Sequence, residues 1–114
     1  MLRKIIRAII PARGEIFFNL FVEGAENVHQ TANIFANIIS AKDKATETQR
    51  SSELRQQRQK ALEIEKKVMV QLNNQFITPL DRGDIQELSV LLLKLTKRIV
   101  KTNSKLQIYA IDIK

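Results

Sequence analysis

The stretch NNQFITPLDRGDIQELSVLLLKL, residues 73–95, decides how this chain folds, because it ends one helix and begins another. Pro79 has no backbone N–H and disfavours helical dihedral angles at Thr78, so a helix is expected to end just before it. Asp81 is a good N-cap, since its carboxylate can accept from the free amides of the next turn. Asp84 follows three residues later, at the capping-box position. The stretch therefore predicts a sharp junction between two helices.

The rest of the chain predicts three long helices, over residues 14–40, 46–76 and 82–111. Apolar residues recur at spacings of three and four, which is the period of one helix face. Three Gly and two Pro leave few turns and disfavour many short strands. With short connections, we expect an all-α, antiparallel bundle of three long helices. Arg82, between the two acids of the junction, could pair with either of them.

Each predicted helix contributes one apolar stripe to the predicted core. On the first helix the stripe comprises Phe17, Leu20, Phe21, Val28, Ala32, Phe35, Ile38 and Ile39. On the third helix it comprises Ile85, Leu88, Leu92, Leu95, Ile99, Leu106, Tyr109 and Ile113. The middle helix is apolar only in its second half, through Ala61, Leu62, Ile64, Val68, Met69, Leu72 and Phe76. Its polar first half, TETQRSSELRQQRQK, either projects into solvent or meets a polar partner.

Composition limits the chemistry that this chain can perform. At 114 residues, with 44% apolar and 27% charged residues, it suits a single globular domain. The absence of Cys excludes disulfides, thiol catalysis and thiolate-bound metal, and a single histidine, His29, cannot form a His-rich metal site. No Ser/His/Asp grouping, phosphate-binding loop or catalytic carboxylate pair is apparent. We therefore expect a protein that is not an enzyme and needs no cofactor.

Residues 1–13 form a basic amphipathic segment ahead of the single domain expected over residues 14–114. Arg3, Lys4 and Arg7 accompany four isoleucines, a pattern that suits an anionic membrane surface. The alternative is a helix or strap that packs on the bundle. The apolar runs here are too short for a signal peptide or a membrane span. The expected location is the cytoplasm, with peripheral contact to the inner face of the cell membrane left open.

The formal net charge of +7 points to an anionic partner. One basic face is expected on the third helix, extended by a residue of the second, through Lys94, Lys97, Arg98, Lys101, Lys105 and Arg58. This face either binds an anion or an acidic partner, or is an ordinary solvated surface. Nucleic-acid binding is the weaker alternative, because no aromatic stacking pattern or glycine-rich loop accompanies the charge.

The junction resembles the signature of the PhoU-like accessory proteins of Pit-type inorganic phosphate transporters. The matching positions are Leu72, Asn73, Phe76, Ile77, Thr78, Pro79, Asp81, Arg82, Asp84 and Ile85, with Gly83 where that family usually has Glu. The run EIFFNLFVEGAENVHQTANIF is also similar to the family's first helix. The resemblance implies a PhoU-like bundle. It also implies a non-enzymatic accessory or regulator of phosphate transport that docks on the cytoplasmic side of such a transporter.

The resemblance does not extend to the family's metal-binding acids. Arg58, Leu62, Leu93, Lys94 and Lys97 stand where the family carries them. Hard cations need oxygen ligands, and carboxylates supply most of the compensating charge, so no metal site is expected. Glu63 and Glu65 would serve only in another register. The alternative function is therefore a helical protein-interaction module that has lost the metal-binding role.

Members of the family carry further helices that complete the bundle, and this chain resembles the first three. Self-association into a homo-oligomer would supply the missing packing surface. A natural short form and a truncated form both fit the sequence.

Overall fold

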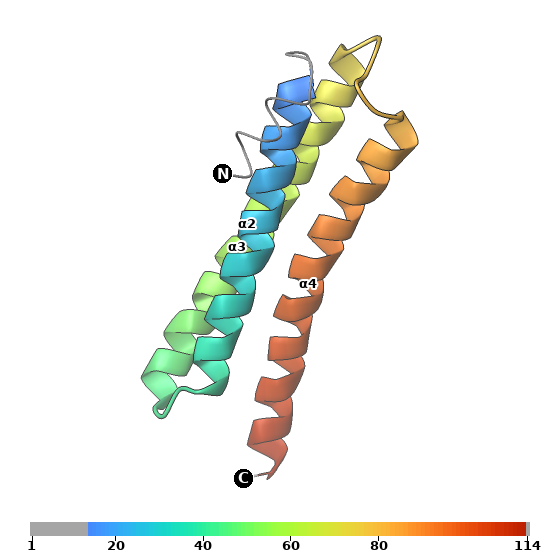
Figure 1. Cartoon of the computed structure of the whole chain (residues 1–114). Coiled ribbons are helices and arrows are strands. Elements are labelled where there is room, and N and C mark those ends of the chain that lie inside the picture. Colours follow the sequence, from blue (N-terminus) through green and yellow to red (C-terminus); the bar gives the residue numbers. More distant parts are fainter. Residues whose placement is uncertain (1–13, 114) are drawn as a thin grey trace.

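The computed structural model describes residues 14–113, with side chains up to Tyr109. It contains three helices within that range, α2 (Glu15–Ile39), α3 (Lys44–Asn74) and α4 (Arg82–Ile113). They run alternately up and down, and each contacts the other two (Figure 1). This confirms the all-α, three-helix prediction. The basic N-terminal segment, with Arg3, Lys4 and Arg7, lies outside the described residues.

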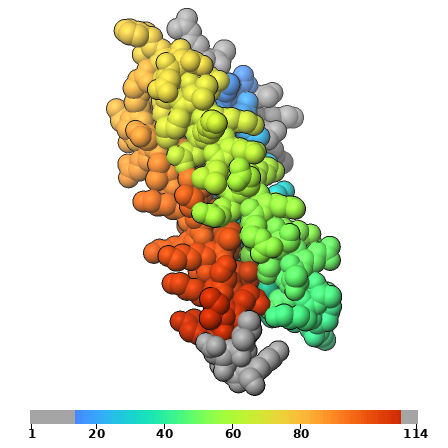
Figure 2. Space-filling model, turned by 180° about the vertical axis from the view of Figure 1, so that it is seen from behind, coloured from blue at the N-terminus to red at the C-terminus, as the bar shows by residue number. Residues whose placement is uncertain are grey.

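The alternation brings particular chain segments together at each end of the bundle. The start of α2, the end of α3 and the start of α4 lie at one end, and the opposite termini lie at the other (Figure 1). Seen from behind, α3 and α4 lie side by side over the length of the molecule (Figure 2). The molecule is 56 Å long and 28 Å by 17 Å across, as expected for a single bundle of long helices.

The helix boundaries follow from local chemistry. The helix α3 begins slightly earlier than predicted because Asp43, in an extended conformation, caps it: its carboxylate accepts from the Thr46 N–H at 3.2 Å. The same helix ends at Asn74, a little before the predicted residue 76, and Gln75 is already extended. The predicted stop before Pro79 is confirmed.

An apolar cluster fills the junction end of the bundle. It consists of Phe17, Leu20, Val68, Leu72 and Ile85, with Phe21 and Met69 packed against it. A short distance along, α2 and α4 approach closely at Gly24, where an added Cβ atom would lie 2.9 Å from a methyl carbon of Leu92. Glycine therefore permits a closer approach of these two helices than a larger residue would.

The middle of the bundle is held together by a buried asparagine. Asn27 of α2 is 1% exposed, and its amide nitrogen donates to the backbone oxygen of Gln57 at 3.0 Å and to its side-chain oxygen at 2.8 Å. The Thr96 hydroxyl of α4 donates to the Asn27 side-chain oxygen at 2.8 Å. The Thr31 hydroxyl donates to the Asn27 backbone oxygen at 2.6 Å. One side chain thus links all three helices.

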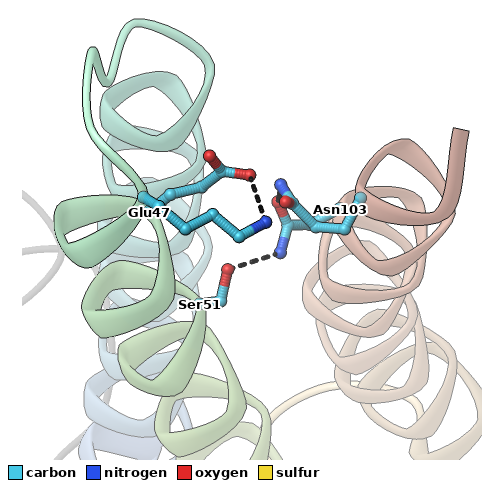
Figure 3. A network of polar contacts seen from close by, with 5 residues as sticks. Glu47, Ser51 and Asn103 are labelled. Carbon is cyan, nitrogen blue, oxygen red and sulfur yellow. Dashed lines mark hydrogen bonds and ion pairs between the residues drawn. The ribbon is translucent and has the colours of Figure 1, made fainter. Parts of the chain in front are cut away.

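A second polar contact lies farther from the junction, between α3 and α4 (Figure 3). The Asn103 amide donates to the Ser51 hydroxyl at 3.2 Å, and the nearby Glu47 carboxylate lies 4.0 Å from the Lys44 ammonium. Together with the contacts of Gln57, this shows that the polar half of α3 meets polar partners. Both interpretations of that half hold in part, because Ser51 and Gln57 meet polar partners whereas residues such as Arg55 and Arg58 are exposed.

The predicted apolar stripes are only partly right. On α2, Phe17, Leu20 and Ile38 are buried, but Ala32 and Ile39 are exposed. On α4, Ile85 is buried and Leu92 and Ile99 are half-buried. The prediction is wrong for a second group of α4 residues, which are exposed: Leu88, Leu95, Leu106 and Tyr109. The Ile113 side chain lies outside the described residues.

Polar residues, which the predicted α4 stripe did not include, take several of the inward positions on this helix. Ser89, Thr96 and Asn103 are buried and recur every seven residues, which is the period of a helix face in a coiled-coil-like bundle. Thr96 and Asn103 find hydrogen-bond partners on α2 and α3. Because those partners compensate their burial, the helix turns this face inward and leaves part of its apolar surface outside.

We expect Asn27→Ala to lower the free energy of unfolding by about 1–3 kcal/mol, because it leaves the buried Thr96 hydroxyl and the half-buried Gln57 side chain without their partner. Urea denaturation of the purified chain would measure the change. Asn33→Ala is the matched control: Asn33 is exposed on the same helix and should change stability by no more than about 0.5 kcal/mol. Equal losses in the two variants would contradict the linking role of Asn27.

A pH dependence is expected at the start of α3. Hydrogen bonding from the side chain and the backbone of Thr46 lowers the pKa of the Asp43 carboxyl below its ordinary value. The stabilisation is therefore present at neutral pH and is lost as the pH falls through the lowered pKa. In urea unfolding, Asp43→Ala should be less stable than wild type at neutral pH, and the difference should become smaller in acid, where the protonated Asp43 carboxyl keeps only a neutral capping oxygen. Asp43→Asn, which keeps a capping oxygen, should retain most of the stability throughout.

Candidate docking surface

The junction between α3 and α4 is held by Arg82. Its guanidinium donates to the backbone oxygen of Leu72 at 2.7 Å, to that of Phe76 at 3.2 Å, and to that of Gln75. These carbonyls lie at the end of α3, where a helix has no further amides to satisfy them and where positive charge is favoured. The expectation that Arg82 pairs with Asp81 or Asp84 is therefore wrong. The carbonyl cluster is the better partner because it presents several acceptors at once.

The predicted N-cap of α4 is confirmed. The Asp81 carboxylate accepts from the Asp84 N–H at 3.2 Å, and the Asp81 backbone oxygen accepts from the Ile85 N–H at 3.1 Å. The Thr78 hydroxyl donates to the Leu80 backbone oxygen at 2.6 Å, which tightens the turn around Pro79. These hydrogen bonds thus hold the junction together.

The junction presents apolar side chains to solvent. Phe76 is 95% exposed, Ile77 is 70% exposed, and Leu80 is also exposed. Free surfaces rarely carry several large apolar side chains in one place, and such groups often mark an interaction site. The Arg82 contacts fix the backbone that carries them, so this apolar tip is displayed on an ordered turn.

Apolar side chains of α4 are also exposed farther from the junction. Leu88, Leu91 and Leu95 are 39%, 51% and 42% exposed. Their spacing of three and four residues places them along one flank of the helix. Leu91 and Leu95 also line a shallow depression on the outer side of α4.

Four of the predicted basic residues line the same depression. Lys94, Lys97, Arg98 and Lys101 surround Leu91 and Leu95. In the described part of the chain, none of the four forms an ion pair with a carboxylate. We refer to the surface formed by Leu88, Leu91, Lys94, Leu95, Lys97, Arg98 and Lys101 as the α4 strip. It combines apolar contact area with unneutralised positive charge.

Two other predicted basic residues lie outside this group. Lys105 is exposed one turn beyond Lys101 but does not line the depression. Arg58 is exposed on α3, and no contact joins it to the α4 cations within the described residues. The basic face is therefore centred on α4 alone, and the predicted extension onto α3 through Arg58 is not part of this depression.

Sequence reasoning assigned Leu88 and Leu95 to the core and missed their place in the α4 strip. The signal that was available is the run Val-Leu-Leu-Leu at residues 90–93, followed by Leu95. Consecutive apolar residues point in different directions around a helix, so they cannot all face one core. An excess of this kind predicts an exposed apolar flank, although it does not say which leucines form it.

Two of the positions that the resemblance assigned to metal-binding acids serve other purposes here. Leu93 is buried, and it lines a small interior space of about 10 Å³ with Asn27 and Glu65. Lys94 is exposed and belongs to the α4 strip. The described residues contain no group of three or more His, Asp or Glu side chains that could hold a metal ion. Over the same residues, no helix is long and apolar enough to cross a membrane.

Comparison of the chain with protein-family models, with curated proteins and with solved structures finds no match.

We expect Arg82→Met to lower the free energy of unfolding by about 1–2 kcal/mol, because the carbonyls at the end of α3 lose a charged donor. Urea unfolding would measure the loss. Hydrogen exchange should show faster opening of the last turn of α3 and the first turn of α4. Arg98→Met is the matched control, since it removes an exposed arginine of the same helix that has no such contacts. An unchanged stability in Arg82→Met would contradict the holding role of Arg82.

Proposed function

We propose that this protein is a non-enzymatic accessory or regulator of inorganic phosphate transport. It acts by docking on the cytoplasmic side of a Pit-type transporter. The observation that carries the docking role is the α4 strip, where Leu91 and Leu95 lie exposed among four cations. The choice of a phosphate transporter rests on the resemblance of the junction to the PhoU-like accessory proteins.

The groups gathered on α4 favour binding over chemistry. Leucine side chains supply apolar surface, and its removal from water stabilises the complex in which it is buried. Lysine and arginine supply positive charge, which speeds association with an acidic surface and selects against a basic one. These side chains suit a docking face better than a catalytic one, and the proposal assigns no reaction to the chain.

The resemblance of the junction lies in its sequence, and the matching residues also have structural roles. Thr78, Asp81 and Arg82 fix the turn between α3 and α4 through hydrogen bonds. Since these residues belong to the family phrase, we infer that the phrase specifies this way of joining two helices. That inference supports a shared architecture for the helix pair. The proposed function has a separate basis, which is the α4 strip.

The second candidate is a helical interaction module that has lost the family's metal-binding role. The burial of Leu93 favours it, because an apolar side chain occupies a position where the family carries an acid. Calorimetric titration of the purified chain with divalent metal ions tests this candidate. Tight binding would contradict it and would require ligands in another register, such as Glu63 and Glu65.

Three further expectations belong to the proposal and are tested apart from it. These are self-association, contact of the basic segment at residues 1–13 with an anionic membrane, and a cytoplasmic location. Size-exclusion chromatography with light scattering tests the first. Sedimentation with anionic vesicles tests the second, and cell fractionation tests the third.

The proposed function is tested by co-purification with a transporter and by measurement of phosphate uptake. A tagged chain should co-purify with a Pit-type transporter from solubilised membranes, and deletion of the gene should alter phosphate uptake. The double variant Leu91→Ser, Lys94→Glu should reduce the recovered transporter about tenfold or more, equivalent to about 1.4 kcal/mol of binding.

The matched control is Val70→Ser, Lys66→Glu, which makes the same two changes on the outer face of α3. Val70 is exposed, and Lys66 lies beside it. This control variant should recover the transporter as wild type does. No association with the transporter, together with unchanged phosphate uptake after deletion, would overturn the proposal.

A further inference from the structure

The residues of the α4 strip indicate what kind of partner the protein binds as well as where that partner docks. The inference rests on the proposed function in one respect, namely that the chain works by docking. It does not depend on the partner being a phosphate transporter.

We propose that the α4 strip binds an amphipathic helix of a partner protein, whose apolar seam is bordered by aspartate and glutamate. The leucines would pack against the seam, and the cations would pair with its acidic border. This is the helix-in-groove mode of recognition, in which side chains spaced three, four and seven residues apart provide the contacts.

The spacing of the leucines favours a helical partner. Leu88, Leu91 and Leu95 follow one flank of α4 with the heptad-like intervals that two packed helices share. The exposed leucines extend farther, to Leu106, over about 27 Å of helix at 1.5 Å per residue. A partner helix of about 18 residues would match that length. The depression at Leu91 and Leu95 offers a place for a projecting side chain.

The charge of α4 favours an acidic border. Between Leu88 and Tyr109 the helix carries five cations and no Asp or Glu. Lys94, Lys97, Arg98 and Lys101 have no carboxylate partner within the described chain. A partner that brings carboxylates supplies the missing counter-charges. A neutral or basic helix would instead exclude water from around these cations without supplying any negative charge.

The same charge argues against a second copy of this chain at the α4 strip. Two copies packed through this surface would bring their cations together, and like charges facing each other across an interface oppose association. The formal net charge of +7 adds to that repulsion. Self-association, where it occurs, is expected to use another surface, such as the apolar tip formed by Phe76, Ile77 and Leu80.

A membrane surface fits the α4 strip less well than a helix does. A helix that lies in a bilayer surface projects its apolar side chains outward into the acyl region. Leu91 and Leu95 instead form part of the lining of a depression, and lysine and arginine side chains complete that lining. A single projecting side chain of a partner helix fits this shallow, mixed lining better than the flat face of a bilayer does.

Site-specific photocrosslinking of the full chain in cells tests this inference. A photoreactive amino acid replaces Leu91 in one variant and Val70 in a control variant, both exposed apolar positions. Mass spectrometry then identifies the segment captured. The expected result is a crosslink at residue 91 to a partner segment with leucine-type residues at helical spacing and Asp or Glu beside them. The yield should be several-fold higher than from residue 70.

Charge reversal provides the second readout. Lys94→Glu with Lys101→Glu should reduce the yield at residue 91 at least about fivefold, whereas Lys66→Glu with Lys67→Glu on α3 should leave it unchanged. Capture of a second copy of this chain, capture of lipid, no capture at all, or equal yields from residues 91 and 70 would each overturn the inference. Circular dichroism of each variant checks that the fold is retained.

The experiment separates failure of the inference from failure of the proposed function. An acidic helix from a protein other than a phosphate transporter would support the inference and contradict the proposed function. A transporter segment that is basic or lacks a helical apolar seam would support the proposed function and overturn the inference.

Discussion

The bundle depends on the buried amide of Asn27. A side-chain amide that is removed from water must find partners inside the protein, because burial without them costs several kcal/mol in an apolar medium. Asn27 finds them on both neighbouring helices, at Gln57 and at Thr96. An axial slip of either helix by one turn would break these contacts, so the asparagine specifies the register of the bundle as well as adding to its cohesion. Polar residues at coiled-coil core positions act in the same way.

The outer surface of α4 follows from this constraint. Thr96 must face inward to reach Asn27, and the seven-residue period then turns Ser89 and Asn103 inward as well. With the inward face occupied in part by polar residues, the leucine-rich middle of α4 has more apolar side chains than the core accepts. Leu91 and Leu95 therefore remain outside, among cations that pair with no carboxylate of the described residues. The polar interior and the proposed docking surface are thus two consequences of one rotation of the helix.

The junction has a different role from the α4 strip, although both begin in the same stretch of sequence. Asp81 and Arg82 are accounted for by helix capping: one satisfies free amides at the start of α4, and the other satisfies free carbonyls at the end of α3. These capping contacts specify how the two helices are joined, whereas the charge and exposure of α4 carry the proposed docking role.

The sequence by itself determined the three helices, the stop before Pro79 and the cap at Asp81, because helix ends depend on residues within a few positions of one another. The basic face of α4 could also be predicted from the sequence, since the spacing of Lys94, Lys97 and Lys101 places them on one side of the helix. Only the tertiary structure decided which face of α4 turns inward, because Thr96 has its partner 69 residues away at Asn27. It also decided that Arg82 contacts carbonyls rather than acids, and that Leu88 and Leu95 lie outside. The physical reason is common to these cases: caps and spacing are local properties, whereas the burial of a polar or apolar side chain depends on what the other helices offer it.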